Sequence, residues 1–131
     1  LAVSRSEHFS EPMDGIIYSI ATAIGFSVVE NILYISAFGL TVAPLRGTIA
    51  TLAHIAFSGL AGYYLGKARF SARPVVQLAL GLAVGALAHG LYDFLLITHL
   101  VSPFFLIVLV LGLQYVLFMG IQEAVKSHQG R

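Results

Sequence analysis

Residues 74–97 read PVVQLALGLAVGALAHGLYDFLLI and decide the fold class, because such an apolar run is long enough to cross a lipid bilayer. A helix needs about 20 mainly apolar residues to span roughly 30 Å of hydrocarbon. Pro74 stands where the first turn of a helix tolerates proline. Similar runs occupy residues 15–40, 47–66 and 103–121, so the sequence predicts a bundle of about four transmembrane helices.

The composition of the whole chain agrees with this interpretation. Of its 131 residues, 58% are hydrophobic and only 10% are charged, and the mean hydropathy is +0.90. Soluble domains carry roughly a quarter charged residues. We therefore predict an all-α membrane protein in which residues 1–131 form a single membrane domain in a lipid bilayer. The net charge of +1 gives no electrostatic basis for binding nucleic acid, and the absence of cysteine excludes disulfides and thiolate metal sites.

The basic residues predict how the bundle is oriented. If the helices alternate in direction, six of the seven lysines and arginines fall on one side of the membrane: Arg5, Lys67, Arg69, Arg73, Lys126 and Arg131. Arg46 falls on the other side. Cytoplasmic loops of membrane proteins carry an excess of Lys and Arg. We therefore expect both termini to be cytoplasmic.

Glycines recur at a spacing that favours close helix packing. Gly62 and Gly66 are four residues apart, as are Gly81 and Gly85. Small residues at this spacing let transmembrane helices approach closely. We expect both pairs to be packing contacts.

Four ionisable residues lie inside the predicted spans: Glu30, His54, His89 and Asp93. Placing a charge at the bilayer centre costs at least about 2.5–3.5 kcal/mol of free energy, so each of these residues calls for a structural or functional explanation. At a rise of about 1.5 Å per residue, Glu30 and His89 lie roughly 22 Å from the cytoplasmic face, and His54 about 20 Å from it. We expect these three to form one cluster in the outer half of the bilayer. The alternatives are a protonated structural glutamate, a packing histidine and an interhelical tie made by His89 with Asp93.

These residue types point to hydrolysis by an activated water. A buried glutamate can act as general base, and a histidine can stabilise the oxyanion or protonate the leaving amine. Alternatively, Glu30, His54 and His89 offer a carboxylate and two imidazoles that could bind zinc and leave a fourth position for water. Asp93 lies one turn beyond His89, where its carboxylate could fix the ring tautomer. We expect three further residues to contact substrate or support the site: Phe26, Asn31 and Tyr92.

At these positions the chain resembles the PrsW family, within the superfamily that also holds the CAAX prenyl proteases. Residues 11–18, EPMDGIIY, resemble the acidic start of a family membrane helix, and residues 26–34, FSVVENILY, resemble its FxxxEN motif. The family has a middle helix that carries a histidine. His54 and the residues 62–70 after it, GYYLGKARF, are similar to that helix and its end. Residues 89–94, HGLYDF, are similar to the HxxxD motif. The resemblance covers roughly residues 7–94, with the motifs in order.

The resemblance implies a multi-pass protease of the bacterial cytoplasmic membrane that cleaves membrane-anchored substrates. The best-known role of the family is cleavage of an anti-sigma factor, a single-pass membrane protein, in bacterial stress signalling. Applied to this sequence, the resemblance makes Glu30, His54 and His89 active-site residues and gives Asp93 a supporting role. Glu30 in place of a histidine, and Asp93 in place of an asparagine, are typical of the PrsW branch.

One part of the family pattern is absent from the chain. The EExxK motif, to which the activated water of the family is attributed, belongs on a helix before residues 11–18, and no two adjacent residues here are acidic. We therefore expect the chain to be the C-terminal part of a PrsW-like protease core whose N-terminal helices carry the tandem glutamates. The alternative is a naturally incomplete, inactive relative. We do not expect these residues alone to be active.

Two other functions would use the same features. A proton or ion transporter could employ Glu30, His54 and His89 as a relay, because buried acids and histidines mark such pathways. A non-catalytic membrane scaffold could instead bind single-pass partners through glycine-rich helix faces. No inverted repeat or interrupted helix pair is evident in the sequence, and this favours the protease over the transporter.

Overall fold

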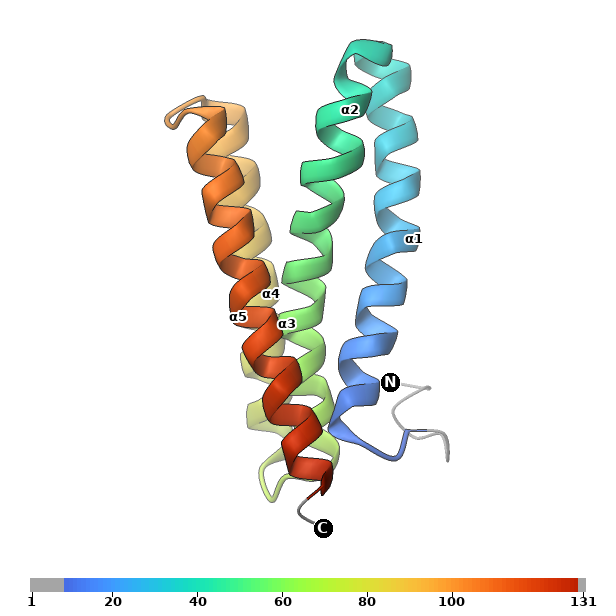
Figure 1. The fold of residues 1–131 in the computed structure, drawn as a ribbon, viewed down its shortest axis with the longest axis vertical. Helices are drawn as coiled ribbons and strands as arrows, with labels where there is room; N and C mark the ends of the chain where they lie inside the picture. Colours follow the sequence, from blue (N-terminus) through green and yellow to red (C-terminus); the bar gives the residue numbers. More distant parts are fainter. Residues whose placement is uncertain (1–8, 130–131) are drawn as a thin grey trace.

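A computed structural model describes residues 9–129, which form helices joined by short connections without any strand (Figure 1). The four long helices are α1 (Pro12–Phe38), α3 (Thr51–Arg69), α4 (Pro74–Thr98) and α5 (Pro103–Gln129). Three short elements connect α1 to α3: a 3₁₀ turn, η2 (Leu40–Val42), the single turn α2 (Ala43–Leu45), and a π-helical turn, η3 (Arg46–Ala50). The predicted all-α fold with four spans is confirmed, because 4 helices of the described part are long and apolar enough to cross a membrane.

The observed helices differ from the predicted spans mainly at their ends. α1 begins at Pro12 because a capping box precedes it, in which the Asp14 carboxylate accepts 2.8 Å hydrogen bonds from the backbone N–H groups of Ser10 and Glu11. α5 continues past residue 121 to Gln129. Before α3, the chain passes through the π-helical turn, where the sequence predicted a continuous helix from residue 47. Local capping and turn geometry therefore set the ends of the apolar spans.

Helix α3 lies in the middle of the bundle and packs against each of the other long helices. α1 runs beside it on one side, and α4 and α5 run on the other side (Figure 1). Towards the end that holds the α1–α3 and α4–α5 connections, α3 stays beside α1, and this pair diverges from α4 and α5. α3 is therefore the element that links residues of α1 to residues of α4 and α5.

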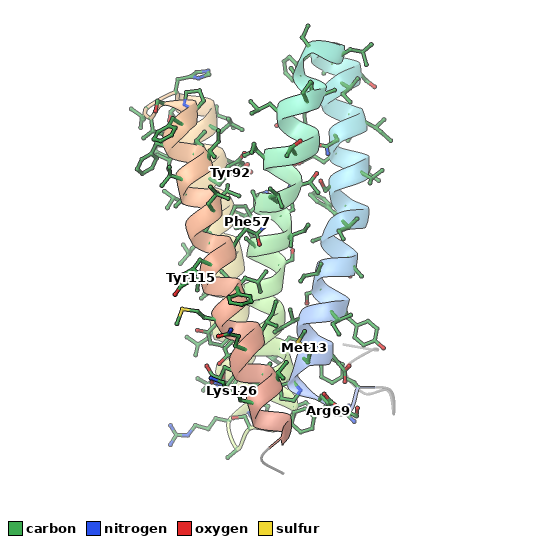
Figure 2. The ribbon with its side chains drawn as sticks, in the orientation of Figure 1. Met13, Phe57, Arg69, Tyr92, Tyr115 and Lys126 are labelled. Carbon is green, nitrogen blue, oxygen red and sulfur yellow. The ribbon has the colours of Figure 1, made fainter. Side chains whose placement is uncertain are left out.

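Four basic residues lie at one end of the bundle, which we call the basic end: Lys67, Arg69, Arg73 and Lys126. α1 and α4 begin there, and α3 and α5 end there; Figure 2 shows Arg69 and Lys126 at this end. Arg46 lies in η3 near the opposite end. Arg5 and Arg131 lie outside the described residues. The described basic residues are thus divided as the sequence predicted, and the side of the membrane that the basic end faces stays a prediction.

Glycines let α3 approach its neighbours closely. A Cβ atom on Gly66 would overlap the backbone of Pro12, and one on Gly62 would also overlap the backbone of α1. On the other side of α3, a Cβ atom on Gly81 would lie 2.9 Å from the carbonyl oxygen of Ala61. The glycines that the sequence singled out therefore lie at helix contacts, where they hold α1 and α4 against α3.

Apolar side chains fill the centre of the bundle and also cover its outside. Phe57 of α3 and Tyr92 of α4 lie in a buried cluster with Ala53, Leu106 and Val110 (Figure 2). Many large apolar side chains on the outer faces of α1, α4 and α5 remain exposed. In a bilayer these faces contact lipid tails, so the apolar exterior agrees with a membrane-spanning protein.

Candidate active site

The carboxylate of Glu30 and the imidazole of His54 meet between α1 and α3. Glu30 Oε2 lies 2.7 Å from His54 Nε2, which is a hydrogen-bonding distance. Helical side chains lean towards the N-terminus of their own helix. Because α1 and α3 run in opposite directions, the two side chains lean towards each other, and the acid and the imidazole are brought into contact.

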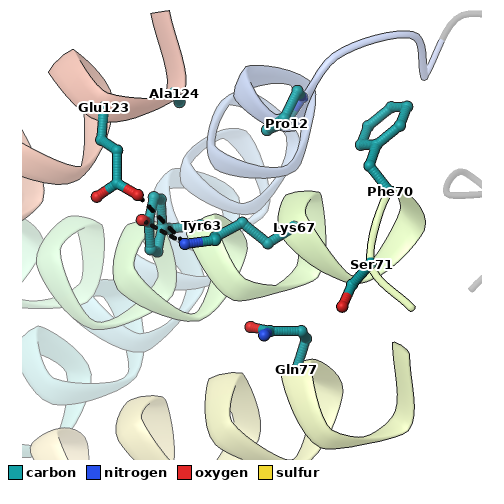
Figure 3. A pocket seen from close by; sticks show the side chains of 8 residues that line it. All are labelled: Pro12, Tyr63, Lys67, Phe70, Ser71, Gln77, Glu123 and Ala124. Atoms are coloured by element: carbon teal, nitrogen blue, oxygen red, sulfur yellow. Dashed lines mark hydrogen bonds and ion pairs between the residues drawn. The ribbon is translucent and has the colours of Figure 1, made fainter. Parts of the chain in front are cut away.

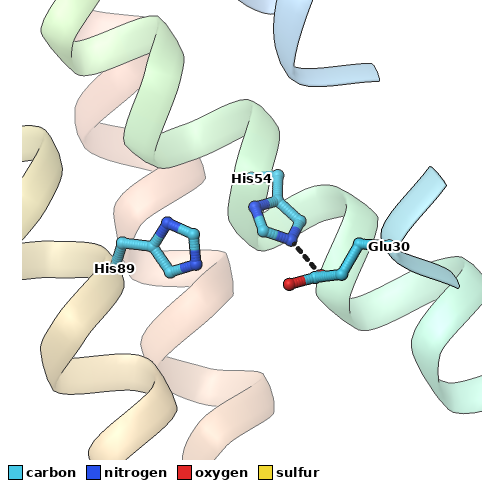
Figure 4. A group of neighbouring side chains, drawn as sticks. All are labelled: Glu30, His54 and His89. Atoms are coloured by element: carbon cyan, nitrogen blue, oxygen red, sulfur yellow. Dashed lines mark hydrogen bonds and ion pairs between the residues drawn. The ribbon is translucent and has the colours of Figure 1, made fainter. Parts of the chain in front are cut away.

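His89 of α4 completes the cluster. Its ring centroid lies 4.8 Å from that of His54, and the two rings are nearly perpendicular, at 79°. Glu30, His54 and His89 can each offer one ligand atom such that all three atoms lie within 4.8 Å of one another (Figure 4). The structure therefore brings together the three residues that the sequence placed at one level. Their catalytic role stays a prediction.

The cluster is buried at α3 and more open at α4. The side chain of His54 is 8% exposed and that of Glu30 is 21% exposed. The side chain of His89 is 33% exposed. Within the described part of the chain, the accessible side of the cluster is therefore that of His89.

Aromatic rings frame the two histidines. Phe57 stacks on His89 with ring centroids 5.4 Å apart and 25° between the planes. The ring centroids of Phe26 and His54 are 5.3 Å apart, with the planes nearly perpendicular. Those of Tyr92 and Phe57 are 5.7 Å apart. The sequence singled out Phe26 and Tyr92 and missed Phe57, although Phe57 follows His54 by three residues on the same helix. Phe57 thus links Tyr92 to His89.

Asp93 stands beside His89, one turn further along α4. Its Oδ2 atom lies 3.3 Å from His89 Nε2, and its side chain is 47% exposed. Residues four apart on a helix are neighbours, which is why the sequence predicted this pairing. Asp93 therefore has the position that a supporting residue for His89 requires.

A network of hydroxyl and amide groups joins α1 to α3 beside the cluster. Ser27 Oγ lies 2.7 Å from Thr51 Oγ1, and the Asn31 amide donates to Thr51 Oγ1 at 3.2 Å and to Ser27 Oγ at 3.4 Å. Asn31 Oδ1 is buried and has no hydrogen-bond partner among the described residues. A buried acceptor is costly to leave unpaired, and the described residues supply no donor for this oxygen.

The sequence singled out Asn31 but missed the two hydroxyl residues of this network. A signal for them exists, because Ser27 precedes Glu30 by three residues and Thr51 precedes His54 by three residues. Such spacing places each hydroxyl on the same helix face as a cluster residue. The two faces together form the polar part of the α1–α3 interface.

The donor atoms of the cluster fit a zinc ion. Zinc binds histidine nitrogens and carboxylate oxygens at about 2.0–2.2 Å, and its catalytic sites use three protein ligands. Glu30, His54 and His89 supply one oxygen and two nitrogens, and separations up to 4.8 Å let all three approach one ion with small side-chain movements. The residues therefore fit a three-ligand site with one position left for water.

Comparison with known proteins gives a family match over nearly the whole chain. Residues 1–121 match the family described as PrsW family intramembrane metalloprotease. The Protease PrsW of Bacillus subtilis (strain 168) is 42% identical over 98 residues, which are 73% of this chain and 45% of that protein. The Protease PrsW of Oceanobacillus iheyensis is 32% identical over 117 residues, which are 85% of this chain and 54% of that protein.

A third relative shows the same partial coverage. The Protease PrsW of Geobacillus kaustophilus (strain HTA426) is 38% identical over 92 residues, which are 70% of this chain and 41% of that protein. The chain thus spans about half the length of the curated relatives that it matches. No solved structure matches the chain.

Proposed function

Because the chain belongs to the PrsW family of intramembrane metalloproteases, we propose that Glu30, His54 and His89 are active-site residues of a membrane-embedded endopeptidase. The observation that carries this proposal is the convergence of one carboxylate and two imidazoles from three helices within 4.8 Å. Ionisable groups inside a membrane are costly to bury and mark functional sites by default. The proposed reaction is hydrolysis of a peptide bond in a membrane-anchored substrate.

Glu30, His54 and His89 would hold a zinc ion, which when bound lowers the pKa of its water and polarises the substrate carbonyl. Asp93 would hold the His89 ring in one orientation, at its 3.3 Å contact. Phe57 would limit the rotation of the same ring by stacking on it. These contacts matter because a misplaced reactive group loses rate steeply.

Asn31, Phe26 and Tyr92 are proposed to assist at the edge of the site. Asn31 would support the site by joining α1 to α3 through its hydrogen bonds to Ser27 and Thr51. The ring of Phe26 lies against that of His54, with centroids 5.3 Å apart, and would keep bulk water from it. Tyr92 would support Phe57 and, through it, His89.

The second route to hydrolysis uses no ion. Glu30 would then act as the general base towards water, with His54 holding its carboxylate at 2.7 Å. The family description as a metalloprotease and the fit of the donor set to zinc both favour the metal route. Elemental analysis of the purified full-length protein separates the two routes.

We propose that the substrates are single-pass membrane proteins such as an anti-sigma factor, and that the site works in the bacterial cytoplasmic membrane. The support is that the relatives named Protease PrsW are bacterial proteins and that the cluster lies within membrane-length helices. With the basic end facing the cytoplasm, both termini would be cytoplasmic.

Cleavage is proposed as an activity of the full-length protein. The chain spans about half the length of its relatives, and its 131 residues contain no pair of adjacent glutamates. The water-activating pair that the family resemblance implies would then be supplied by residues beyond this chain. Experiments on activity should therefore use the full-length protein.

The proposal is tested by reconstituting the full-length protein in liposomes with a candidate single-pass substrate. Glu30→Ala and His89→Ala are expected to abolish cleavage. His99→Asn is the control, because His99 is an exposed histidine outside the cluster and asparagine tolerates its left-handed backbone. Undiminished cleavage by both cluster variants would overturn the proposal, and ion uptake without peptide hydrolysis would favour a transporter.

A further inference from the structure

A second polar cluster lies at the basic end, away from the candidate active site. Lys67 Nζ donates hydrogen bonds to Tyr63 Oη at 3.0 Å and to Glu123 Oε1 at 3.2 Å. Figure 3 shows these three side chains meeting between α3 and α5, at the edge of a pocket of about 260 Å³. The cluster therefore ties the two helices together where they end.

Beside this tie, α3 and α5 form a groove of about 510 Å³. Its inner part is apolar and is lined by Leu60, Val116, Met119 and Gly120. Its outer part, towards the basic end, is polar and is lined by Tyr63, Tyr64, Gln122, Glu123 and Lys126. From Val116 to Lys126 the helix rises about 15 Å. The groove thus changes from apolar to polar along the membrane normal, as a phospholipid does.

The charges along the groove leave one positive charge to be matched. Lys67 and Glu123 offset each other at 3.2 Å. Lys126 is exposed and has no ion-pair partner among the residues that the structure describes. A phosphodiester carries one negative charge, so a phosphate beside Lys126 would complete the charge balance at the outer end of the groove.

The shape of the groove depends on a glycine. A Cβ atom on Gly120 would lie 3.5 Å from Cδ2 of the Tyr63 ring. Because glycine has only a hydrogen at that position, the face of the Tyr63 ring stays open. A longer side chain at this position would fill the space between α5 and Tyr63. Gly112, on the same helix, meets nothing within 4 Å, so a side chain there would point into open space.

We propose that this groove is a binding site for an anionic phospholipid. An acyl chain lies along the apolar inner part, and the phosphodiester lies at Lys126 in the outer part. Basic pockets between transmembrane helices recognise anionic headgroups in this way. The bound lipid would fill the space beside the Tyr63–Lys67–Glu123 tie and hold α5 against α3. This inference is independent of the proposed protease activity.

Native mass spectrometry of the full-length protein in detergent, with phosphatidylglycerol or phosphatidylcholine added, tests the proposal. The wild-type protein is expected to retain phosphatidylglycerol preferentially. Lys126→Gln is expected to weaken this retention about fivefold, since a basic residue near an anionic headgroup contributes about 1 kcal/mol. Gly120→Leu is expected to abolish it by filling the groove.

Two substitutions serve as matched controls. Arg73→Gln removes a basic residue of the same end that does not line the groove, and Gly112→Leu adds the same side chain to α5 in open space. Both are expected to retain phosphatidylglycerol as the wild type does. Equal retention of the two lipids by the wild type would overturn the proposal, and so would undiminished retention in Lys126→Gln. The latter substitution is at an exposed position, so folding is preserved even if Gly120→Leu is unstable.

Discussion

The hydroxyl of Ser27 lies 2.7 Å from the hydroxyl of Thr51, and this contact joins the two helices that carry Glu30 and His54. Ser27 precedes Glu30 by three residues in α1, and Thr51 precedes His54 by three residues in α3. Because the helices are antiparallel, the contact lies between the levels of the two cluster residues. It therefore joins α1 to α3 beside the 2.7 Å contact of Glu30 with His54.

Thr51→Val keeps the shape of the side chain and removes the hydroxyl shared by Ser27 and Asn31. We expect a loss of about 1–3 kcal/mol in the free energy of unfolding, because polar groups of both partners stay buried without a bond. Reversible unfolding of the full-length protein in SDS measures this free energy of unfolding. Thr22→Val is the control, since Thr22 bonds the carbonyl of Tyr18 within its own helix. An equal loss in both variants would contradict the role given to the network.

Metal removal is expected to abolish peptide cleavage by the full-length protein, and re-addition of zinc is expected to restore it. The reason is that Glu30, His54 and His89 supply a three-ligand set within 4.8 Å. Elemental analysis should find zinc in the wild type and in His99→Asn, and little in His89→Ala. Full cleavage after verified removal of all metal would instead favour Glu30 as a metal-free general base.

Asp93→Asn is expected to weaken zinc binding about 10–100-fold, as the loss of a carboxylate behind a metal-binding histidine commonly does. The side chain of Asp93 is 47% exposed, so the fold should be preserved. Competition with a zinc-binding dye measures the affinity. Gly90→Ala, whose added Cβ meets nothing within 4 Å, should bind zinc as the wild type does. Unchanged affinity in Asp93→Asn would remove Asp93 from the site.

Gly66→Ala and Gly25→Ala are the same substitution inside a helix, with opposite expected effects. A Cβ atom on Gly66 would overlap the backbone of Pro12, so α1 must shift, at a cost of about 1–3 kcal/mol. A Cβ atom on Gly25 meets nothing within 4 Å, so this variant should gain about 0.5–1 kcal/mol from helix propensity alone. Unfolding in SDS compares them, and a stabilised Gly66→Ala variant would contradict the close packing of α1 on α3.

Features that depend on position along a helix could be predicted from the sequence. The four spans follow from the length of the apolar runs, and the common level of Glu30, His54 and His89 follows from the rise per residue. Features that depend on rotation about the helix axes could not. Phe57 was missed for this reason, because only the packed structure shows that its ring faces His89.

The connection between the first two spans was also beyond prediction from the sequence. An apolar run has the same hydropathy whether its ends are α-helical, 3₁₀ or π-helical. The structure places a 3₁₀ turn at Leu40–Val42 and a π-helical turn at Arg46–Ala50 before α3 begins. The π-helical turn ends one residue before Thr51, so it sets the rotation with which Thr51 and His54 face α1.

The order of the helices along the chain has a consequence for biosynthesis. The α1–α3 interface, with its glycines and its hydroxyl network, already contains Glu30 in contact with His54. His89 belongs to α4, so the third donor arrives after α1 and α3 have been made. A nascent chain that has inserted α1 and α3 but not α4 therefore carries an incomplete donor set, and the order of synthesis itself delays assembly of the site.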